Sequence, residues 1–337
     1  MILRKPTYFG TFRCIAADCP DSCCKEWDVL VDPVSATAYR QLPGELGEDL
    51  RKFLYEEDGQ VYMAITEGRC PMWRSDGLCR IQAALGHDAL CKTCRDFPRL
   101  RHDYGDFVER GLELSCPEAA RIILNAPAAS LTEAEVPGGE EPEYDTDAMA
   151  VLLRTREKAL ALVRDPMPPG DMLSALLLYG CQAQSELDGG DEMSFRPESA
   201  LAGVRDFAKA GEPSEITGFF LGLEILTEPW SRLLQNPRPG PWDQRTPALA
   251  RYLVERYWLQ AVSDYDLYCR VKFIVIFCLL AKILGGDLLQ TAQLASKEIE
   301  NNTENVEVIL DAAYAHPAFT DDKLLGLLLA RDQEDNL

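Results

Sequence analysis

Cysteine is concentrated in the first third of this 337-residue chain, and that concentration constrains the fold more than any other feature of the sequence. Nine of the twelve cysteines lie within the first 116 residues: Cys14, Cys19, Cys23, Cys24, Cys70, Cys79, Cys91, Cys94 and Cys116. Cores use cysteine sparingly, so this density needs a chemical reason, and disulfides, zinc and iron–sulfur chemistry are the three available. The remaining cysteines stand singly in apolar helical patterns and are interpreted as core residues: Cys181, Cys269 and Cys278.

The start of the chain and its apolar stretches argue against secretion and against a membrane span. No apolar run follows Arg4 and Lys5, so the opening does not have the pattern of a signal peptide. The longest apolar stretch, 271–284, contains two lysines and is too short to cross a bilayer. We therefore expect a cytoplasmic protein, in a reducing compartment where thiols stay free for metals and structural disulfides are disfavoured.

The net charge of −21 is spread unevenly along the chain. Residues 1–125 hold 16 Lys+Arg and 20 Asp+Glu, a balance of −4, which leaves −17 for residues 126–337. A strongly acidic surface repels phosphate backbones and anionic lipids, so neither nucleic acid nor a membrane is an expected partner. The acidic half would tolerate a cationic protein, although solubility alone is the simpler explanation of its charge.

Residues 1–125 predict a small, irregular, cysteine-rich module of the kind that a metal centre holds together. Short strands are expected over 7–14 and 61–66. A hairpin that turns at Asp76-Gly77 should bring Cys70 and Cys79 together. Short helices are expected after Asp32-Pro33, over 81–85 and from Pro117.

The rest of the chain predicts an acidic linker and then a helical bundle. Residues 126–147 carry seven acidic residues and no basic one, which is typical of a mobile linker. Residues 148–337 contain helical patterns separated by glycine and proline breaks, over 149–163, 171–187, 198–210, 214–234, 247–261, 264–284, 287–299, 303–315 and 320–331. The expected fold is therefore mainly α, with an irregular N-terminal module containing a short β hairpin, followed by a helical bundle.

The spacing of the cysteines indicates a metal centre without deciding its type. A zinc ribbon needs two CxxC knuckles, and only Cys91 and Cys94 form one. The CxxCxxC run of ferredoxins is absent, and the CxxxCxxC of radical enzymes that cleave S-adenosylmethionine begins at Cys19 and Cys23 but meets Glu26 at its third position. Iron–sulfur clusters nevertheless accept scattered thiolates, and two of the cysteines precede proline, a habit of cluster ligands.

Several short motifs, taken in order, resemble the flagellin lysine-N-methylase family. They are Phe12-x-Cys14, Cys19, Cys23-Cys24-x2-Trp27, Cys70-Pro71, Leu78-Cys79-x-Ile81, Gly86, Cys94-x2-Phe97-Pro98-Arg99 and Ser115-Cys116-Pro117-Glu118. The resemblance covers residues 8–122, and the family is itself similar to a wider group of small cysteine-rich domains that chelate zinc or iron.

The resemblance implies a mainly helical protein that holds a [4Fe–4S] cluster and methylates lysines of flagellin with S-adenosylmethionine. Four of the eight motif cysteines would ligate the cluster, from the set Cys14, Cys19, Cys23, Cys24, Cys70, Cys79, Cys94 and Cys116. Cys91 falls outside the motif, and zinc is the alternative metal. The helical remainder carries no motif that matches the family.

Methyl transfer to lysine makes demands that further residues could meet. Only a neutral amine attacks a methyl group, so the enzyme must desolvate the lysine or supply a base, for which Asp103 and Tyr104 are the candidates. No GxGxG follows a strand, so S-adenosylmethionine would bind in some other way, with Arg99 or Arg95 as candidates to hold its carboxylate. For both arginines a surface salt bridge is the alternative interpretation. The alternative function is a non-catalytic, metal-stabilised binding or chaperone module for a basic partner.

Overall fold

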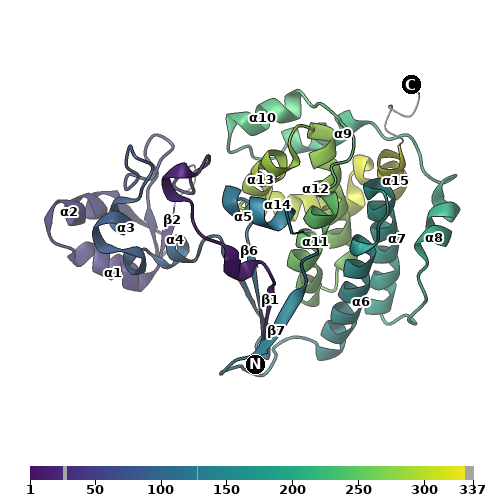
Figure 1. The fold of residues 1–337 in the computed structure, drawn as a ribbon, viewed down its shortest axis with the longest axis horizontal. Coiled ribbons are helices and arrows are strands. Elements are labelled where there is room, and N and C mark those ends of the chain that lie inside the picture. Colours follow the sequence, from purple (N-terminus) through teal and green to yellow (C-terminus); the bar gives the residue numbers. More distant parts are fainter. Residues whose placement is uncertain (26–28, 127, 331–337) are drawn as a thin grey trace.

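Two separate hydrophobic cores organise the chain in the computed structural model, which describes residues 1–25, 29–126 and 128–330 (Figure 1). The small core is built from Val29, Val31, Ala36, Tyr39, Leu50, Met63, Met72, Ile81, Leu90 and Cys91. The large core extends from Tyr8 to Leu328 and includes most buried side chains of the helical half. The two cores occupy opposite sides of the molecule, with the start of the chain passing between them (Figure 1).

The small core is enclosed by short elements with clear local causes. They are β2 (Val29–Val31), α1 (Pro33–Gln41), α2 (Gly44–Phe53), β3 (Leu54–Glu57), β4 (Gln60–Met63), α3 (Arg80–Leu85) and α4 (Lys92–Asp96). The strands form an antiparallel sheet in the order β2-β4-β3. Asp32 begins α1 by accepting a hydrogen bond from the Ser35 amide at 3.0 Å, with Pro33 in the first turn, as the sequence predicted.

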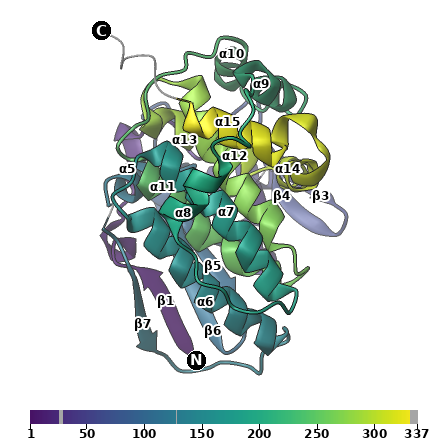
Figure 2. The same cartoon turned by 90° about the vertical axis from the view of Figure 1, so that its right-hand side faces the viewer.

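A second sheet joins the start of the chain to the helical half. Its order is β5-β6-β1-β7, from β1 (Ile2–Pro6), β5 (Arg99–Asp103), β6 (Phe107–Leu112) and β7 (Leu131–Glu135). β1 is parallel to β6 and antiparallel to β7, where Arg4 lies opposite Glu133. This sheet packs beside the helices of the large core (Figure 2).

The large core is helical. Its helices are α5 (Pro117–Leu124), α6 (Thr146–Arg164), α7 (Pro169–Leu187), α8 (Pro197–Val204), α9 (Pro213–Leu221), α10 (Glu228–Gln235), α11 (Thr246–Tyr257), α12 (Leu267–Leu284), α13 (Leu288–Ile299), α14 (Thr303–Ala315) and α15 (Asp321–Leu329). Sixteen of the eighteen residues of α12 are buried, so this helix is surrounded by the others on every side. No helix in the described ranges is long and apolar enough to cross a membrane.

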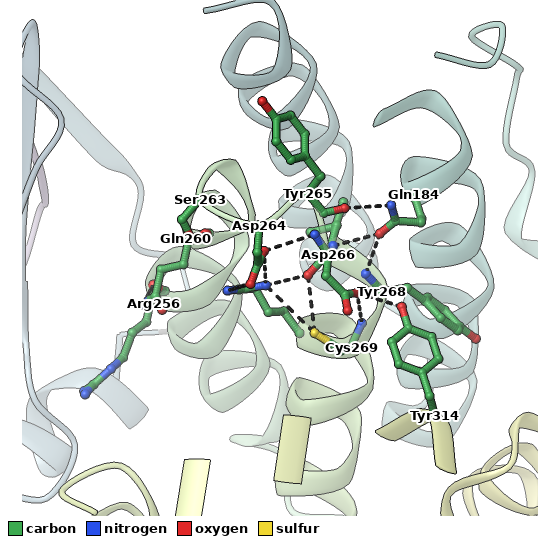
Figure 3. Close-up of polar contacts among 12 residues, drawn as sticks. Gln184, Arg256, Gln260, Ser263, Asp264, Tyr265, Asp266, Tyr268, Cys269 and Tyr314 are labelled. Carbon is green, nitrogen blue, oxygen red and sulfur yellow. Dashed lines mark hydrogen bonds and ion pairs between the residues drawn. The ribbon is translucent and has the colours of Figure 1, made fainter. Parts of the chain in front are cut away.

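A polar network fixes the start of α12 (Figure 3). The side chain of Asp266 accepts from the Cys269 amide at 3.2 Å, and the Gln184 side-chain oxygen accepts from the amides of Leu267 and Tyr268 at 2.7 and 2.9 Å. Arg270 pairs with Asp264 at 2.8 Å. These contacts satisfy amides that a helix N-terminus leaves without partners, and they tie α7 to α12, so we assign the network a structural role.

The mainly α fold and the hairpin at Asp76-Gly77 are confirmed, and three local predictions are wrong. Residues 7–14 do not form a strand, because the strand is β1 and a 3₁₀ turn at Phe9–Thr11 follows it. Residues 214–234 form two helices, α9 and α10, because Thr227 and Pro229 begin a new one. Residues 131–135 of the expected linker form β7. The division into domains at 125 and 148 stays a prediction, and Trp27 of the CC-x2-W motif lies outside the described residues.

Candidate metal centre

All nine N-terminal cysteines line a single cavity of about 350 Å³. The remaining lining is largely apolar and includes Phe12, Val31, Met72 and Phe97. All twelve cysteines of the chain carry free thiols. The fold therefore brings cysteines that are about a hundred positions apart to one cavity. Among the described residues, no three His, Cys, Asp or Glu side chains are arranged to hold a single metal ion.

The hairpin predicted from Asp76-Gly77 carries the middle cysteines to the cavity. Trp73 and Cys79 form a β bridge, and the Arg74 amide donates to the Leu78 carbonyl at 2.8 Å. Gly77 has a φ of +80°, a conformation that glycine adopts without steric cost. The turn therefore follows from its sequence, and it places both Cys70 and Cys79 at the cavity.

Three of the cysteines stand at the N-caps of short helices. Cys79 precedes α3, Cys91 precedes α4, and Cys116 precedes α5 with Pro117 in its first turn. None of the three thiols makes a capping hydrogen bond to its helix. For Cys79 and Cys116 burial raises the thiol pKa, and the nearby backbone amides only partly offset that effect.

The loop that carries Cys14, Cys19, Cys23 and Cys24 is held against the helical half through Asp21. The Lys297 ammonium on α13 lies 3.1 and 3.0 Å from the two carboxylate oxygens of Asp21. Gln293, one helical turn earlier, donates to Asp21 at 3.1 Å and to the Ser115 carbonyl at 2.7 Å. Lys297 is 2% exposed and lines the cavity, so the large core contributes a buried cation to the cysteine site.

The thiols fall into two electrostatic groups. Burial raises the pKa of Cys70 to about 12 and that of Cys116 to about 11, and it also raises the pKa of Cys79. A hydrogen bond with the neighbouring Cys23 thiol lowers the pKa of Cys24 to about 7. Cys94 has the same effect on Cys91, whose pKa is also lowered to about 7. The thiols with raised pKa values therefore keep their protons at neutral pH until a metal displaces them.

The structure separates the residues that we proposed to bind S-adenosylmethionine. Arg99 lines the cavity, with its guanidinium 5.1 Å from the centre of the Phe12 ring. Arg95 lies on α4 and is not part of the lining. The assignment of either residue to the cofactor stays a prediction.

The candidate bases lie outside the cysteine cavity, where β5 ends. Asp103 bonds to Arg101, which lowers the pKa of its carboxyl, and it is exposed. Tyr104 stacks on Phe107 with ring centres 4.6 Å apart, and burial raises the pKa of its phenol. Neither group lines the cavity, so their assignment as bases gains no support from its geometry.

Sequence reasoning missed three residues of the cavity. Cys91 falls outside the motifs of the resemblance, although its CxxC spacing with Cys94 was a signal that could have included it. Asp21 and Lys297 are 276 positions apart and carry no local signal, because only the tertiary fold makes them neighbours.

The fold and the site define a class of mainly α-helical protein with a thiol-lined cavity next to the helical core. Over 134 residues the chain is 33% identical to the flagellar biosynthetic protein FliU of Salmonella muenchen, a match covering 38% of this chain and 79% of that protein. It is also 33% identical, over 134 residues, to the lysine-N-methylases of Salmonella typhimurium strain LT2 and Salmonella choleraesuis strain SC-B67. The chain belongs to the flagellin lysine-N-methylase family, which confirms the resemblance drawn from its motifs.

The similarity to the relatives is partial. The matched region covers 33% of the length of each of the two lysine-N-methylases and 38% of this chain. No family model and no solved structure matches the chain.

Proposed function

We propose that this protein is an S-adenosylmethionine-dependent protein lysine N-methyltransferase with a [4Fe–4S] cluster in the cysteine cavity, acting on flagellin or a similar surface protein. The observation that carries the proposal is the convergence of nine thiols on one cavity in a chain related to curated lysine-N-methylases. The activity follows the name of the lysine-N-methylases, and flagellin as the acceptor follows from the motif resemblance together with the flagellar name of FliU.

The donor set of the cavity suits an iron–sulfur cluster. Thiolates are soft ligands that select zinc, copper(I) or iron–sulfur clusters. A cavity of about 350 Å³ has far more room than one ion needs, which favours a cluster over a single zinc ion. The nine thiols exceed the four that either metal centre takes. A bound [4Fe–4S] cluster would supply a redox-active centre whose four irons each take one thiolate. The cluster ligands would come from the nine cysteines that line the cavity.

Residues of this chain would support that centre and its cofactor. Lys297 lies at the cavity wall and holds Asp21 at 3.0 Å, so it neutralises a carboxylate that would otherwise repel ionised thiolates. Arg99 presents a guanidinium at the same cavity, suited to the carboxylate of S-adenosylmethionine. The acceptor lysine must lose its proton before it attacks the methyl group, so the rate should rise with pH unless a base within the pocket masks the trend.

Iron and sulfide analysis of anaerobically purified protein tests the cluster. We expect about four of each per chain. Replacing Cys79 with Ser should lower both, whereas the matched change Cys181→Ser, outside the cavity, should leave both unchanged. Stoichiometric zinc without sulfide would contradict the cluster.

Labelled S-adenosylmethionine, incubated with cluster-loaded protein and flagellin from the same source, tests the activity. We expect label on flagellin lysines. Arg99→Ala should weaken cofactor binding by about fivefold or more, because a charge-assisted bond is lost, whereas Arg95→Ala, outside the cavity, should not. No label together with no cofactor binding would favour the alternative, a metal-stabilised binding module for a basic partner, which the net charge of −21 would suit.

A further inference from the structure

A second cavity, of about 360 Å³, lies between the edge of the four-stranded sheet and α6. The sheet contributes Arg4 from β1 and Glu133 from β7. The helix contributes Arg156, Glu157 and Arg164, which recur at the spacing of one helical face. α6 lies on the far side of the sheet from the small module in Figure 1, and it runs next to β1 in Figure 2.

Arg156 is a buried arginine with one hydrogen-bond donor left over. Its side chain is almost fully buried, with 1% of the residue exposed. Its two terminal nitrogens donate to the carboxylate of Glu109 at 2.8 and 2.7 Å. Its Nε has no partner within the described residues. A buried donor without a partner is costly, so its position on a cavity wall indicates that a ligand or water completes it.

Arg4 repeats this arrangement on the sheet side of the cavity. Its Nε donates to Glu133 at 2.7 Å, while its Nη1 is buried and makes no hydrogen bond in the described part of the chain. The carboxylate of Glu109 lies 3.9 Å from that Nη1, too far for a hydrogen bond. Among the described residues that line this cavity, two buried side-chain atoms lack a hydrogen-bond partner, and both are guanidinium nitrogens, Nη1 of Arg4 and Nε of Arg156.

Arg164 adds a third guanidinium at the same cavity. It is exposed, and it makes no hydrogen bond or salt bridge to any residue that the structure describes. Of the acids in the lining, Glu133 is already paired with Arg4, and Glu157 is exposed to solvent. Three arginines thus gather at one cavity of a chain whose net charge is −21.

We propose that this cavity binds a small molecule through an anionic oxygen group, either a carboxylate or a phosphate. Guanidinium donors match the planar oxygens of both groups, and bonds between them are charge-assisted. The volume is within the range of small-ligand pockets. The site lies apart from the cysteine cavity, so it depends neither on a metal nor on the proposed methyl transfer.

Calorimetric titration of the whole chain tests the site with three probes: inorganic phosphate, L-methionine and S-adenosylmethionine. We expect saturable binding of at least one probe, with one site per chain. Arg164→Gln should weaken it about tenfold or more, since a charge-assisted bond is lost. The matched control is Arg232→Gln on α10, which removes the same charge from an exposed pair with Glu228 and should leave binding unchanged. Arg164 is the residue of choice because it is exposed, so its loss should not unfold the protein.

The outcomes distinguish the sources of the oxygen group. Competition of phosphate with L-methionine or S-adenosylmethionine, weakened by Arg164→Gln but not by Arg99→Ala, would show that the cavity takes a carboxylate ligand. Phosphate binding without competition would assign the cavity to a phosphate ligand. Both outcomes support the site. No saturable binding of any probe up to about 10 mM, or equal weakening by the two arginine variants, would overturn the proposal and leave a cavity filled with water.

Discussion

Replacing Glu109 with Gln should strongly destabilise the protein at the interface of the sheet and α6. Glu109 on β6 is 7% exposed and holds Arg156 on α6, which is 1% exposed, through two bonds of 2.8 and 2.7 Å. The substitution leaves the Arg156 guanidinium buried without a bonded counterion, with only the more distant carboxyl of Glu255 near it, which costs about 3–5 kcal/mol of unfolding free energy. Arg4 also loses its nearby charge at 3.9 Å, so the upper half of that range is expected.

The reverse change, Arg156→Met, should cost less. Glu109 then keeps Arg4 as a partial partner, whereas Arg156 has no second acid within bonding distance in the described residues. Urea unfolding of both single variants and of the double variant measures the coupling, and the double variant should lose less than the sum of the two. A loss below about 1 kcal/mol for Glu109→Gln, or strict additivity, would refute the view that this pair is buried and mutually dependent.

Three further predictions concern the cysteine cavity and the buried carboxyl of Glu255. Cys79→Ser and Cys94→Ser should make the first 125 residues more sensitive to protease than the helical half, and equal resistance in mutant and wild type would show that neither thiol is a ligand. Lys297→Met should speed hydrogen exchange in residues 16–24 by removing the cation bound to Asp21, and unchanged exchange there would contradict the anchoring role. Burial raises the pKa of the Glu255 carboxyl from 4.5 to about 7. Between pH 4.5 and 7 the folded state therefore keeps a proton that the unfolded state has lost, so the free energy of unfolding should fall as pH rises through this range. Urea unfolding should therefore show that the stability of Glu255→Gln relative to wild type is about 2 kcal/mol more favourable at pH 8 than at pH 5.5. The same relative stability at both pH values would count against the shift.

The parts of the fold that sequence reasoning predicted correctly follow local rules. Asp32-Pro33 begins a helix because a side-chain cap and a fixed φ act within one turn. The turn at Asp76-Gly77 needs only the conformational freedom of glycine. The same local rules explain the break between α9 and α10, because Thr227 accepts a hydrogen bond from the Trp230 amide at 3.4 Å and begins a new helix. The apolar pattern continues across the break, so the sequence predicted one helix there.

The parts that were missed depend on distant pairing. β1 lies parallel to β6 across a hundred residues, and nothing in either strand specifies the other. The acidic residues of β7 predict a linker, because such residues are typical of disorder. Four of its five residues are exposed, which is compatible with the edge of a sheet. The cysteine cavity was expected only as a metal module, because its convergence needs the hairpin, the helix N-termini and the Asp21–Lys297 contact together.

The cysteine cavity takes its thiols from both cores, and this has a consequence for the unfolded chain. Cys91 belongs to the small core and Cys116 to the large one. Any ligand that bonds Cys24 and Cys116 together closes a loop of about 90 residues, and a cross-link of that length removes about 4–5 kcal/mol of unfolded-state entropy in the chain-entropy treatment used for disulfides. Occupancy of the cavity should accordingly decide whether the two cores melt in one transition or in two.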